Sequence, residues 1–237
     1  MRADLALSSG VARIGVMGGM FDPVHSGHLQ AALTALRLLA LDQLRLVPCH
    51  VPNHRGPAKA SPTERLEMLQ LATADEPRLL VDPREMERDG VSYTVDTLTS
   101  LRSDFPEATL VLVLGWDAFS GLPSWHRWRD LLTLAHMLVI SRPSATSEQP
   151  LIDGLAQTLR RCQVASTEEL FSQPAGAILV TDELQVDISS TQVRNLLHDG
   201  SDADTLLRSS LLPSSLPPSS LLPRAVAQYI DQHGLYR

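Results

Sequence analysis

Short apolar segments alternate with helical patterns along most of this chain, and this alternation constrains the fold more than any other feature. The strand-like segments are residues 14–17, 44–48, 79–82, 110–114, 137–140 and 178–180. The helical patterns are residues 26–41, 61–73, 94–103, 125–135, 151–161 and 224–233. Such alternation is typical of a parallel sheet covered by helices. We therefore expect a Rossmann-like α/β fold, a doubly wound parallel sheet with helices on both faces.

The segment after the first strand has the composition of a phosphate site. Residues 18–28 read GGMFDPVHSGH. Gly18 and Gly19 would end the strand, where glycine lets backbone amides approach a phosphate. His25 and His28 stand three residues apart at the start of the next helix, where they would share a face and the helix dipole favours anions. In doubly wound sheets, ligands bind outside the carboxyl ends of the strands, which is where this segment would lie.

Other interpretations of the same segment remain open. The glycine pair fits an ordinary strand-to-helix turn. The two histidines could be surface residues without a role, or they could bind zinc together with His50 and His54. We expect Gly27 to leave room for a base or ribose, and Asp22 to cap a helix that Pro23 begins.

A second motif lies near the C-terminal end of the alternating region. Residues 188–194 read ISSTQVR and follow a strand-like run. Ser189 and Gln192 have the spacing of a capping box. Ser190 and Arg194 are four residues apart and would point the same way. Hydroxyls, free helix amides and a guanidinium could hold a polyphosphate, although a plain helix cap with a solvated arginine would have the same sequence.

The composition of the chain argues against several classes of binding partner. The 237 residues have a net charge of −7, which argues against a general nucleic-acid binder. Lys59 is the only lysine among 20 basic residues, so the chain has no P-loop. Two cysteines, Cys49 and Cys162, form no CxxC pair, and no apolar run is long enough for a membrane span. We expect a cytoplasmic enzyme with one domain, residues 13–237, after an N-terminal extension, residues 1–12, and with a Ser/Leu/Pro insertion at 209–223.

Together the two motifs resemble the HxGH and ISSTxxR signatures of the nucleotidyltransferase superfamily. Further stretches resemble the bacterial nicotinate-nucleotide adenylyltransferases, from about residue 13 to the C-terminus. These are residues 51–55, 83–86, 92–94, 97–98, 115–117, 123–125, 229–230 and 234–236. Two departures are Cys49 and His50, where that family often has asparagine, and the insertion at 209–223.

The resemblance implies transfer of the adenylyl group of ATP to nicotinate mononucleotide, without a covalent intermediate. The catalytic residues would be His25, His28 and Arg194. ATP would be bound by Gly18, Gly19, Met20, Phe21, His25, His28, Ser189, Ser190 and Arg194. Nicotinate mononucleotide would be bound by His54, Arg55, Tyr93, Thr94, Asp117 and Trp125. Mg²⁺ would accompany ATP, no residue would be a dedicated metal ligand, and no nucleic acid or membrane would take part; the oligomeric state stays open.

In this assignment the Thr94 amide would bind the nicotinate carboxylate and Trp125 would stack on the pyridine ring. Asp117 would lie near the ribose or adenosine, and the residues at 54–55 near the mononucleotide phosphate. Trp125 could instead share a buried helix face with Trp128, and Asp117 could be a helix cap. The alternative functions are a nicotinamide-mononucleotide or pantetheine-phosphate adenylyltransferase, or a nucleotide sensor without catalysis.

Overall fold

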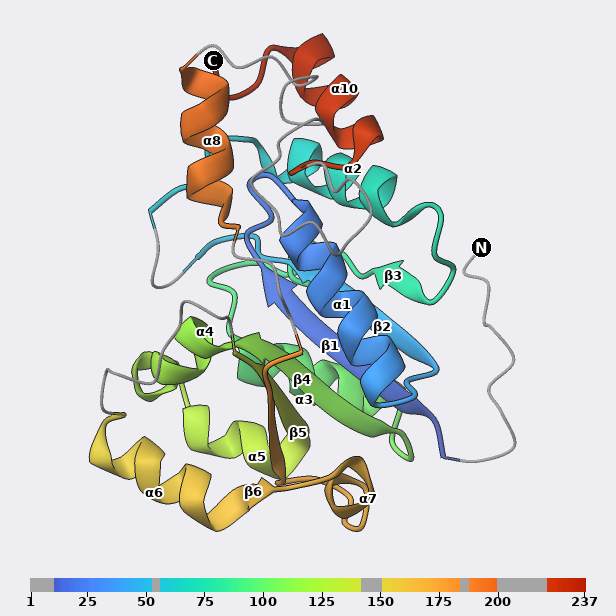
Figure 1. Cartoon of the computed structure of the whole chain (residues 1–237), viewed down its shortest axis with the longest axis vertical. Coiled ribbons are helices and arrows are strands. Elements are labelled where there is room, and N and C mark those ends of the chain that lie inside the picture. The colour runs from blue at the N-terminus through green and yellow to red at the C-terminus, as the bar shows by residue number, and fades with distance from the viewer. Residues whose placement is uncertain (1–10, 53–55, 142–150, 184–187, 200–220) are drawn as a thin grey trace.

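A seven-stranded sheet forms the centre of the molecule (Figure 1). The computed structural model describes residues 11–52, 56–141, 151–183, 188–199 and 221–237. The strands are β1 (Arg13–Gly19), β2 (Gln43–Pro48), β3 (Leu79–Val81), β4 (Thr109–Gly115), β5 (His136–Ile140), β6 (Gln163–Val164) and β7 (Ile178–Thr181). They lie in the order β3-β2-β1-β4-β5-β7-β6, and all neighbouring pairs are parallel. The expected parallel sheet is confirmed.

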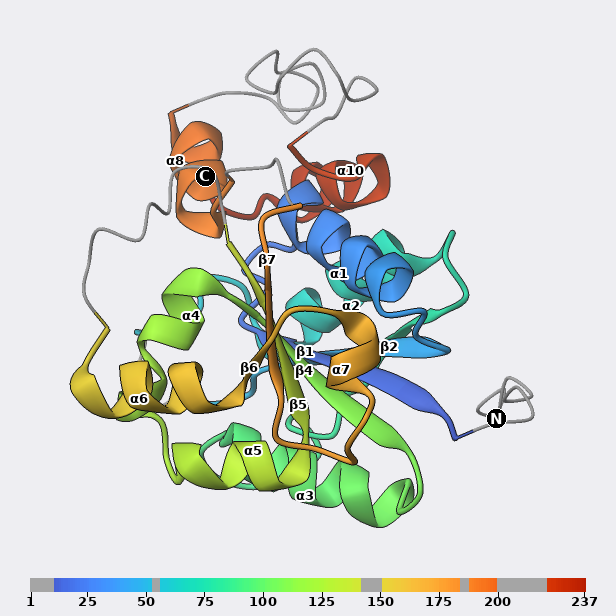
Figure 2. The same ribbon diagram turned by 60° about the horizontal axis from the view of Figure 1, so that its bottom comes forward.

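Helices cover both faces of this sheet. They are α1 (Ser26–Leu38), α2 (Pro62–Thr73), α3 (Thr94–Asp104), α4 (Trp116–Ser120), α5 (Leu131–Leu134), α6 (Asp153–Cys162), α7 (Thr167–Leu170), α8 (Ser190–His198) and α10 (Arg224–His233), with the 3-10 turns η1 (Leu122–Ser124) and η2 (Trp128–Asp130). Figure 2 shows α1, α2, α8 and α10 on one side of the sheet, and α3, α5 and α6 on the other. Alternate residues of β4 follow this division: Val111 packs in the core under α1, and Leu112 packs in the core under α3. The doubly wound arrangement is therefore confirmed.

Helix α1 carries small residues on its buried face. Ala31, Ala32 and Ala35 are buried there, and their short side chains let the helix lie close to the sheet. We expected this helix to reach residue 41, but it ends at Leu38. The reason is Ala40, whose φ of 45° is left-handed and cannot continue an α-helix.

The helix expected over residues 125–135 is wrong. The chain instead forms η1, an extended residue at Trp125, the turn η2 and the short helix α5. Arg127 has a φ of 51°, in the left-handed region, and this residue breaks any continuous helix. Trp125 and Trp128 therefore do not share one helix face: Trp128 is buried in the core and Trp125 is half-buried.

Two expected features lie partly outside the described residues. Of the N-terminal extension, Val11 and Ala12 are described; Ala12 is buried, and its carbonyl accepts a hydrogen bond from the Thr109 N–H at 2.7 Å. Of the Ser/Leu/Pro stretch, Leu221 and Leu222 are buried, and the Leu221 carbonyl accepts from the Ser26 N–H at 3.0 Å. The end of that stretch thus packs beside the start of α1. Within the ranges that the structure describes, no helix is long and apolar enough to span a membrane.

Candidate active site

The carboxyl ends of β1 and β4 lie next to each other at the centre of the sheet. Here the strand order reverses, because β2 follows β1 on one side and β4 leads to β5 on the other. A reversal of this kind leaves a crevice for a ligand. Gly18 and Gly19 end β1, and Gly115 ends β4 just before Asp117. Asp117 is exposed in the first turn of α4, whose cap is Gly115, so the alternative that Asp117 caps a helix is wrong.

His25 and His28 lie together at the start of α1. Their ring centroids are 3.7 Å apart and the rings are stacked. His28 lies in the first turn, but His25 is the N-cap with extended backbone, so the expectation that both stand on the helix is corrected. The His25 N–H donates to Nδ1 of His28 at 3.3 Å. A neutral His28 therefore carries its proton on Nε2, which makes that nitrogen a hydrogen-bond donor.

Asp22 does not cap this helix, contrary to expectation. The helix begins at Ser26, and its N-cap is His25. Asp22 is buried, and its carboxylate accepts the backbone N–H groups of Lys59 at 2.8 Å and of Ala60 at 3.0 Å. Asp22 thus ties the loop after β1 to the segment before α2.

Phe21 supports the histidine pair from within the core. Its ring is buried and meets the His28 ring edge-on, with centroids 5.0 Å apart. Its φ of 48° is left-handed, which is uncommon for an aromatic residue. A Cβ on Gly19 would lie only 3.0 Å from this ring, so the second glycine of the pair makes room for Phe21.

The second motif packs directly on the first. Ser189 caps α8, accepting from the Gln192 N–H at 3.2 Å while the Gln192 side chain accepts from the Ser189 N–H at 2.7 Å, as expected. The Ser190 hydroxyl donates to the Pro23 carbonyl at 3.0 Å. Arg194 donates through one terminal nitrogen to the Asp22 carbonyl at 2.7 Å. The prediction that Ser190 and Arg194 point the same way is confirmed.

Gly27 packs closely against the ring of His25. The residue is buried, and a Cβ there would lie 3.1 Å from Nδ1 of His25 and 3.6 Å from the Ile188 carbonyl oxygen. The missing side chain leaves room for the His25 ring, and the expectation that it also makes space for a base or ribose stays a prediction. The hydrogen bonds of Ser190 and Arg194 place two segments more than 160 residues apart in sequence side by side.

Arg65 of α2 is a component of the site that sequence reasoning missed. The side chain is 1% exposed and donates to the carbonyls of Met20 and Cys49, both at 2.8 Å. It thus joins the loops that follow β1 and β2. Burial lowers the pKa of Arg65, and the nearby Cys49 and Asp22 oppose that shift. The sequence signal that could have indicated its burial is spacing. Arg65 precedes the buried Met68 and Leu69 by three and four residues, which places it on the core face of the helix.

Two of the residues expected to bind the mononucleotide, Tyr93 and Thr94, lie at the start of α3. Tyr93 is the N-cap and Thr94 the first residue of that helix. The Tyr93 ring lies 4.5 Å from the ring of His126, the neighbour of Trp125. Sequence reasoning did not identify His126, which no motif marks. His54 and Arg55 lie outside the described residues, so their expected role is not examined by the structure.

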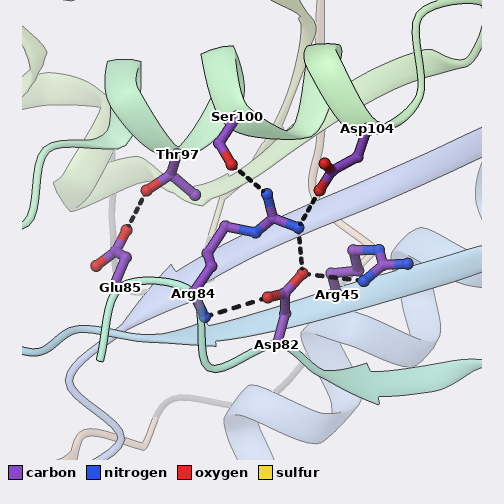
Figure 3. Close-up of polar contacts among 7 residues, drawn as sticks. All are labelled: Arg45, Asp82, Arg84, Glu85, Thr97, Ser100 and Asp104. Atoms are coloured by element: carbon purple, nitrogen blue, oxygen red, sulfur yellow. Dashed lines mark hydrogen bonds and ion pairs between the residues drawn. The ribbon is translucent and has the colours of Figure 1, made fainter. Parts of the chain in front are cut away.

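A network of buried charges holds α3 against β2 and β3 (Figure 3). Asp82 accepts from Arg84 at 2.8 Å and from Arg45 at 2.9 Å. Arg84 also donates to Ser100 of α3 at 2.7 Å and to Asp104 at 3.1 Å. Burial would raise the pKa of Asp82, but the hydrogen bonds and charges of Arg84 and Arg45 outweigh it and lower the pKa.

A buried carboxyl group completes this region. Glu85 accepts the Thr97 hydroxyl of α3 at 2.6 Å, as Figure 3 shows. Burial raises the pKa of Glu85, against hydrogen bonds from Thr97 and Ser92 that lower it. This hydrogen bond helps to hold the beginning of α3, where Thr94 lies.

The part of the chain that the structure describes has no ready-made metal site. Among the described residues, no three or more His, Cys, Asp or Glu side chains gather where they could hold a metal ion. The zinc alternative includes His54, which is not described, and so it stays a hypothesis.

Comparison with known proteins shows the family to which the chain belongs. Residues 16–196 match the family model described as cytidylyltransferase-like. A protein of Aeromonas hydrophila named "probable nicotinate-nucleotide adenylyltransferase" is 42% identical over 224 residues, which cover 94% of this chain and 97% of the relative. A protein of Methylococcus capsulatus with the same name is 45% identical over 199 residues, covering 82% and 92% of the two chains.

Solved structures share the fold. A nicotinic acid mononucleotide adenylyltransferase from Plasmodium falciparum, complexed with NaAD, superposes with a TM-score of 0.69. The match covers 95% of this chain and 97% of the other, at 16% identity. The same enzyme complexed with APC gives a TM-score of 0.65. At this level of identity, the likeness shows a common architecture.

Proposed function

The chain belongs to the cytidylyltransferase-like family and, within it, to the nicotinate-nucleotide adenylyltransferases, and on this premise we propose that it transfers the adenylyl group of ATP to nicotinate mononucleotide. The products are deamido-NAD and pyrophosphate. One observation carries the proposal: Arg194 and Ser190 of α8 dock on the Asp22 and Pro23 carbonyls. This contact places a guanidinium and a helix N-terminus beside the histidine pair, at the end of β1.

The nucleophile needs no general base. The 5′-phosphate of the mononucleotide is mostly ionised at pH 7, because its second pKa is about 6. One of its oxygens forms the new bond to the α-phosphorus of ATP. The bond from that phosphorus to the bridging oxygen breaks, and the electron pair leaves with pyrophosphate. Catalysis then consists of alignment and stabilisation of negative charge.

The chain's own residues supply donors for that charge. Nε2 of His28 would donate to an oxygen of the α-phosphate, and the stacked ring of His25 would lie beside it. The Ser190 amide at the start of α8 would bind the departing phosphates together with Arg194, whereas the Ser189 N–H is held by Gln192. A guanidinium suits this task because its donors form a planar fork that matches phosphate oxygens.

The mononucleotide would lie towards α3. The amides at the start of that helix would bind the nicotinate carboxylate through Thr94. The half-buried Trp125 would stack on the pyridine ring, and Asp117 would approach a ribose. A backbone amide distinguishes an acid from an amide because the carboxylate only accepts hydrogen bonds, whereas a carboxamide must also place its NH₂ group.

Mg²⁺ would enter with ATP, whose phosphates would be its main ligands. The described residues provide no cluster of three or more ligands for a resident ion, and the Asp22 carboxylate is occupied by backbone N–H groups. Mg²⁺ commonly binds in this way, through substrate phosphates and water. The cytoplasmic location and the absence of nucleic-acid and membrane partners remain predictions from composition.

Detection of both products tests the proposal. The full chain is incubated with ATP, Mg²⁺ and nicotinate mononucleotide, and pyrophosphate and deamido-NAD are quantified over time. We expect both in equal amounts, with a strongly reduced rate for Arg194→Ala at limiting ATP. Failure to form pyrophosphate with this or any other pyridine mononucleotide would leave the nucleotide-sensor alternative in place. Product formation only with pantetheine phosphate would assign the chain to that branch of the superfamily.

A further inference from the structure

The C-terminal tail returns to the candidate active site. Helix α10 is fastened to α2, because the Tyr229 hydroxyl donates to Glu67 at 2.6 Å. Gly234 then ends α10 with a φ of 62°, the left-handed cap that glycine favours. The turn directs Tyr236, the penultimate residue, back towards the loop after β1.

Tyr236 meets Asp22 there. Its hydroxyl donates to Oδ1 of Asp22 at 2.8 Å, the oxygen that also accepts the Ala60 N–H. The other carboxylate oxygen accepts the Lys59 N–H and lies 3.8 Å from Arg194. Burial, together with the charge of Asp22, raises the pKa of Tyr236 above its ordinary range, so the hydroxyl stays protonated and remains a donor.

Asp22 also holds Arg194 directly. Its carbonyl oxygen accepts from one terminal nitrogen of the guanidinium at 2.7 Å, and the other terminal nitrogen donates to Thr191 at 3.1 Å. The guanidinium is thereby oriented by one residue from its own helix and by one from the loop after β1. Any movement of the Asp22 backbone would move the point at which Arg194 is fastened.

We propose that Tyr236 is a positioning residue for ATP: its hydroxyl anchors Asp22, and Asp22 in turn orients Arg194 towards the leaving phosphates. This inference rests on the proposed function. It makes the last turn of the chain part of the phosphate site, although Tyr236 follows the Arg194 motif by more than 40 residues. The tail acts through its hydroxyl group and does not itself contact the reacting atoms.

The test compares two tyrosine-to-phenylalanine variants. Tyr236→Phe removes only the hydroxyl that anchors Asp22. Tyr229→Phe is the matched control, since it removes a hydroxyl bonded to a carboxylate in the same C-terminal region but without contact to Asp22. We expect Tyr236→Phe to lower kcat/KM for ATP about tenfold, as loss of a hydrogen bond to a charged group would. The KM for nicotinate mononucleotide should change less than about twofold, and Tyr229→Phe should leave both constants near wild type.

A double-mutant cycle separates positioning from general stabilisation. If Tyr236 acts through Arg194, Tyr236→Phe should have little further effect on ATP use in the Arg194→Ala background. An equal effect in both backgrounds, an equal effect of Tyr229→Phe, or no effect of Tyr236→Phe would overturn the inference. These outcomes require an active wild type. An inactive wild type would instead reject the proposed function, so the two failures are distinguishable.

Discussion

The hydrogen bond to Nδ1 of His28 determines which of its nitrogens can meet a phosphate. Nδ1 accepts the His25 N–H, and the stacked rings fix the plane of the imidazole. Nε2 is then the donor. The motif of two histidines three residues apart is visible in the sequence. The assignment of donor and acceptor depends on His25 being the N-cap rather than part of the helix.

Two substitutions of His28 distinguish the roles of its two ring nitrogens. Asparagine can place an acceptor near the position of Nδ1 but has no donor at Nε2, whereas glutamine can place a donor near Nε2. We expect His28→Asn to lower kcat/KM about 10²–10³-fold, the usual effect of losing a donor to transition-state charge. His28→Gln should retain clearly more activity. Steady-state kinetics with thermal unfolding as a control would check this, and equal activity of both variants would reject Nε2 as the donor.

Arg65 shows where residue patterns fail as predictors. An arginine in a helix is usually solvated, and the residue type alone does not predict burial against two carbonyl groups. Its spacing with Met68 and Leu69 was visible, but the partners Met20 and Cys49 follow two different strands. Only the parallel pairing of β1 with β2 brings those carbonyls within reach of one side chain.

Among the elements, α3 depends most on long-range contacts. Its sequence predicts a helix, and the helix is observed with nearly the expected bounds. What orients it is the charge network of Asp82, Arg84 and Arg45, which joins three elements (Figure 3). The start of α3 carries Thr94, so this network bears on the proposed position of the pyridine ring.

Removing the central carboxylate should loosen α3. Asp82→Asn would leave two largely buried guanidinium groups without their shared anion, a change that costs about 3–5 kcal/mol for a buried pair. Asp104→Asn is the control: Asp104 also bonds Arg84, but its side chain is 52% exposed, and we expect a loss of about 0–1 kcal/mol. Urea unfolding at pH 7 measures both, and similar losses would contradict the central role of Asp82.

The same carboxylate predicts a pH dependence. Because the folded pKa of Asp82 lies below its usual value of 3.8, the unfolded chain takes up the proton first as the pH falls. The contribution of Asp82 to stability is therefore present above pH 3.8 and is lost as the pH falls through the folded pKa. The difference between wild type and Asp82→Asn should shrink below that pH.

Regular elements were the easiest to predict, and irregular ones the hardest. Residues 61–64 read Ser-Pro-Thr-Glu, the pattern of a capping box with proline in the first turn, and Ser61 accepts the Glu64 N–H at 3.2 Å. The segment 125–135 has a helical pattern, yet the left-handed Arg127 divides it. No residue type signals that conformation, because tertiary packing selects it.

On the scale of the whole molecule, the sheet brings distant segments to one edge. The strand order places the ends of β1 and β4 side by side. Helix α8 and the C-terminal tail both form hydrogen bonds to Asp22, in the loop between β1 and α1. The alternation of strands and helices predicted the fold class, and the sequence motifs gave a hypothesis for the phosphate residues. They did not predict that Asp22, Arg65 and Tyr236 would meet, because contacts between such distant positions depend on the path of the entire chain.

Adenylyl transfer to an acid pyridine mononucleotide requires that this chain distinguish a carboxylate from a carboxamide. The most direct measurement compares kcat/KM for nicotinate mononucleotide with that for nicotinamide mononucleotide, at saturating ATP and Mg²⁺. A backbone amide at Thr94 and the start of α3 favour a carboxylate over a carboxamide. We predict a clear preference for the acid, of about tenfold or more. Equal use of both substrates, or a preference for the amide, would contradict the account.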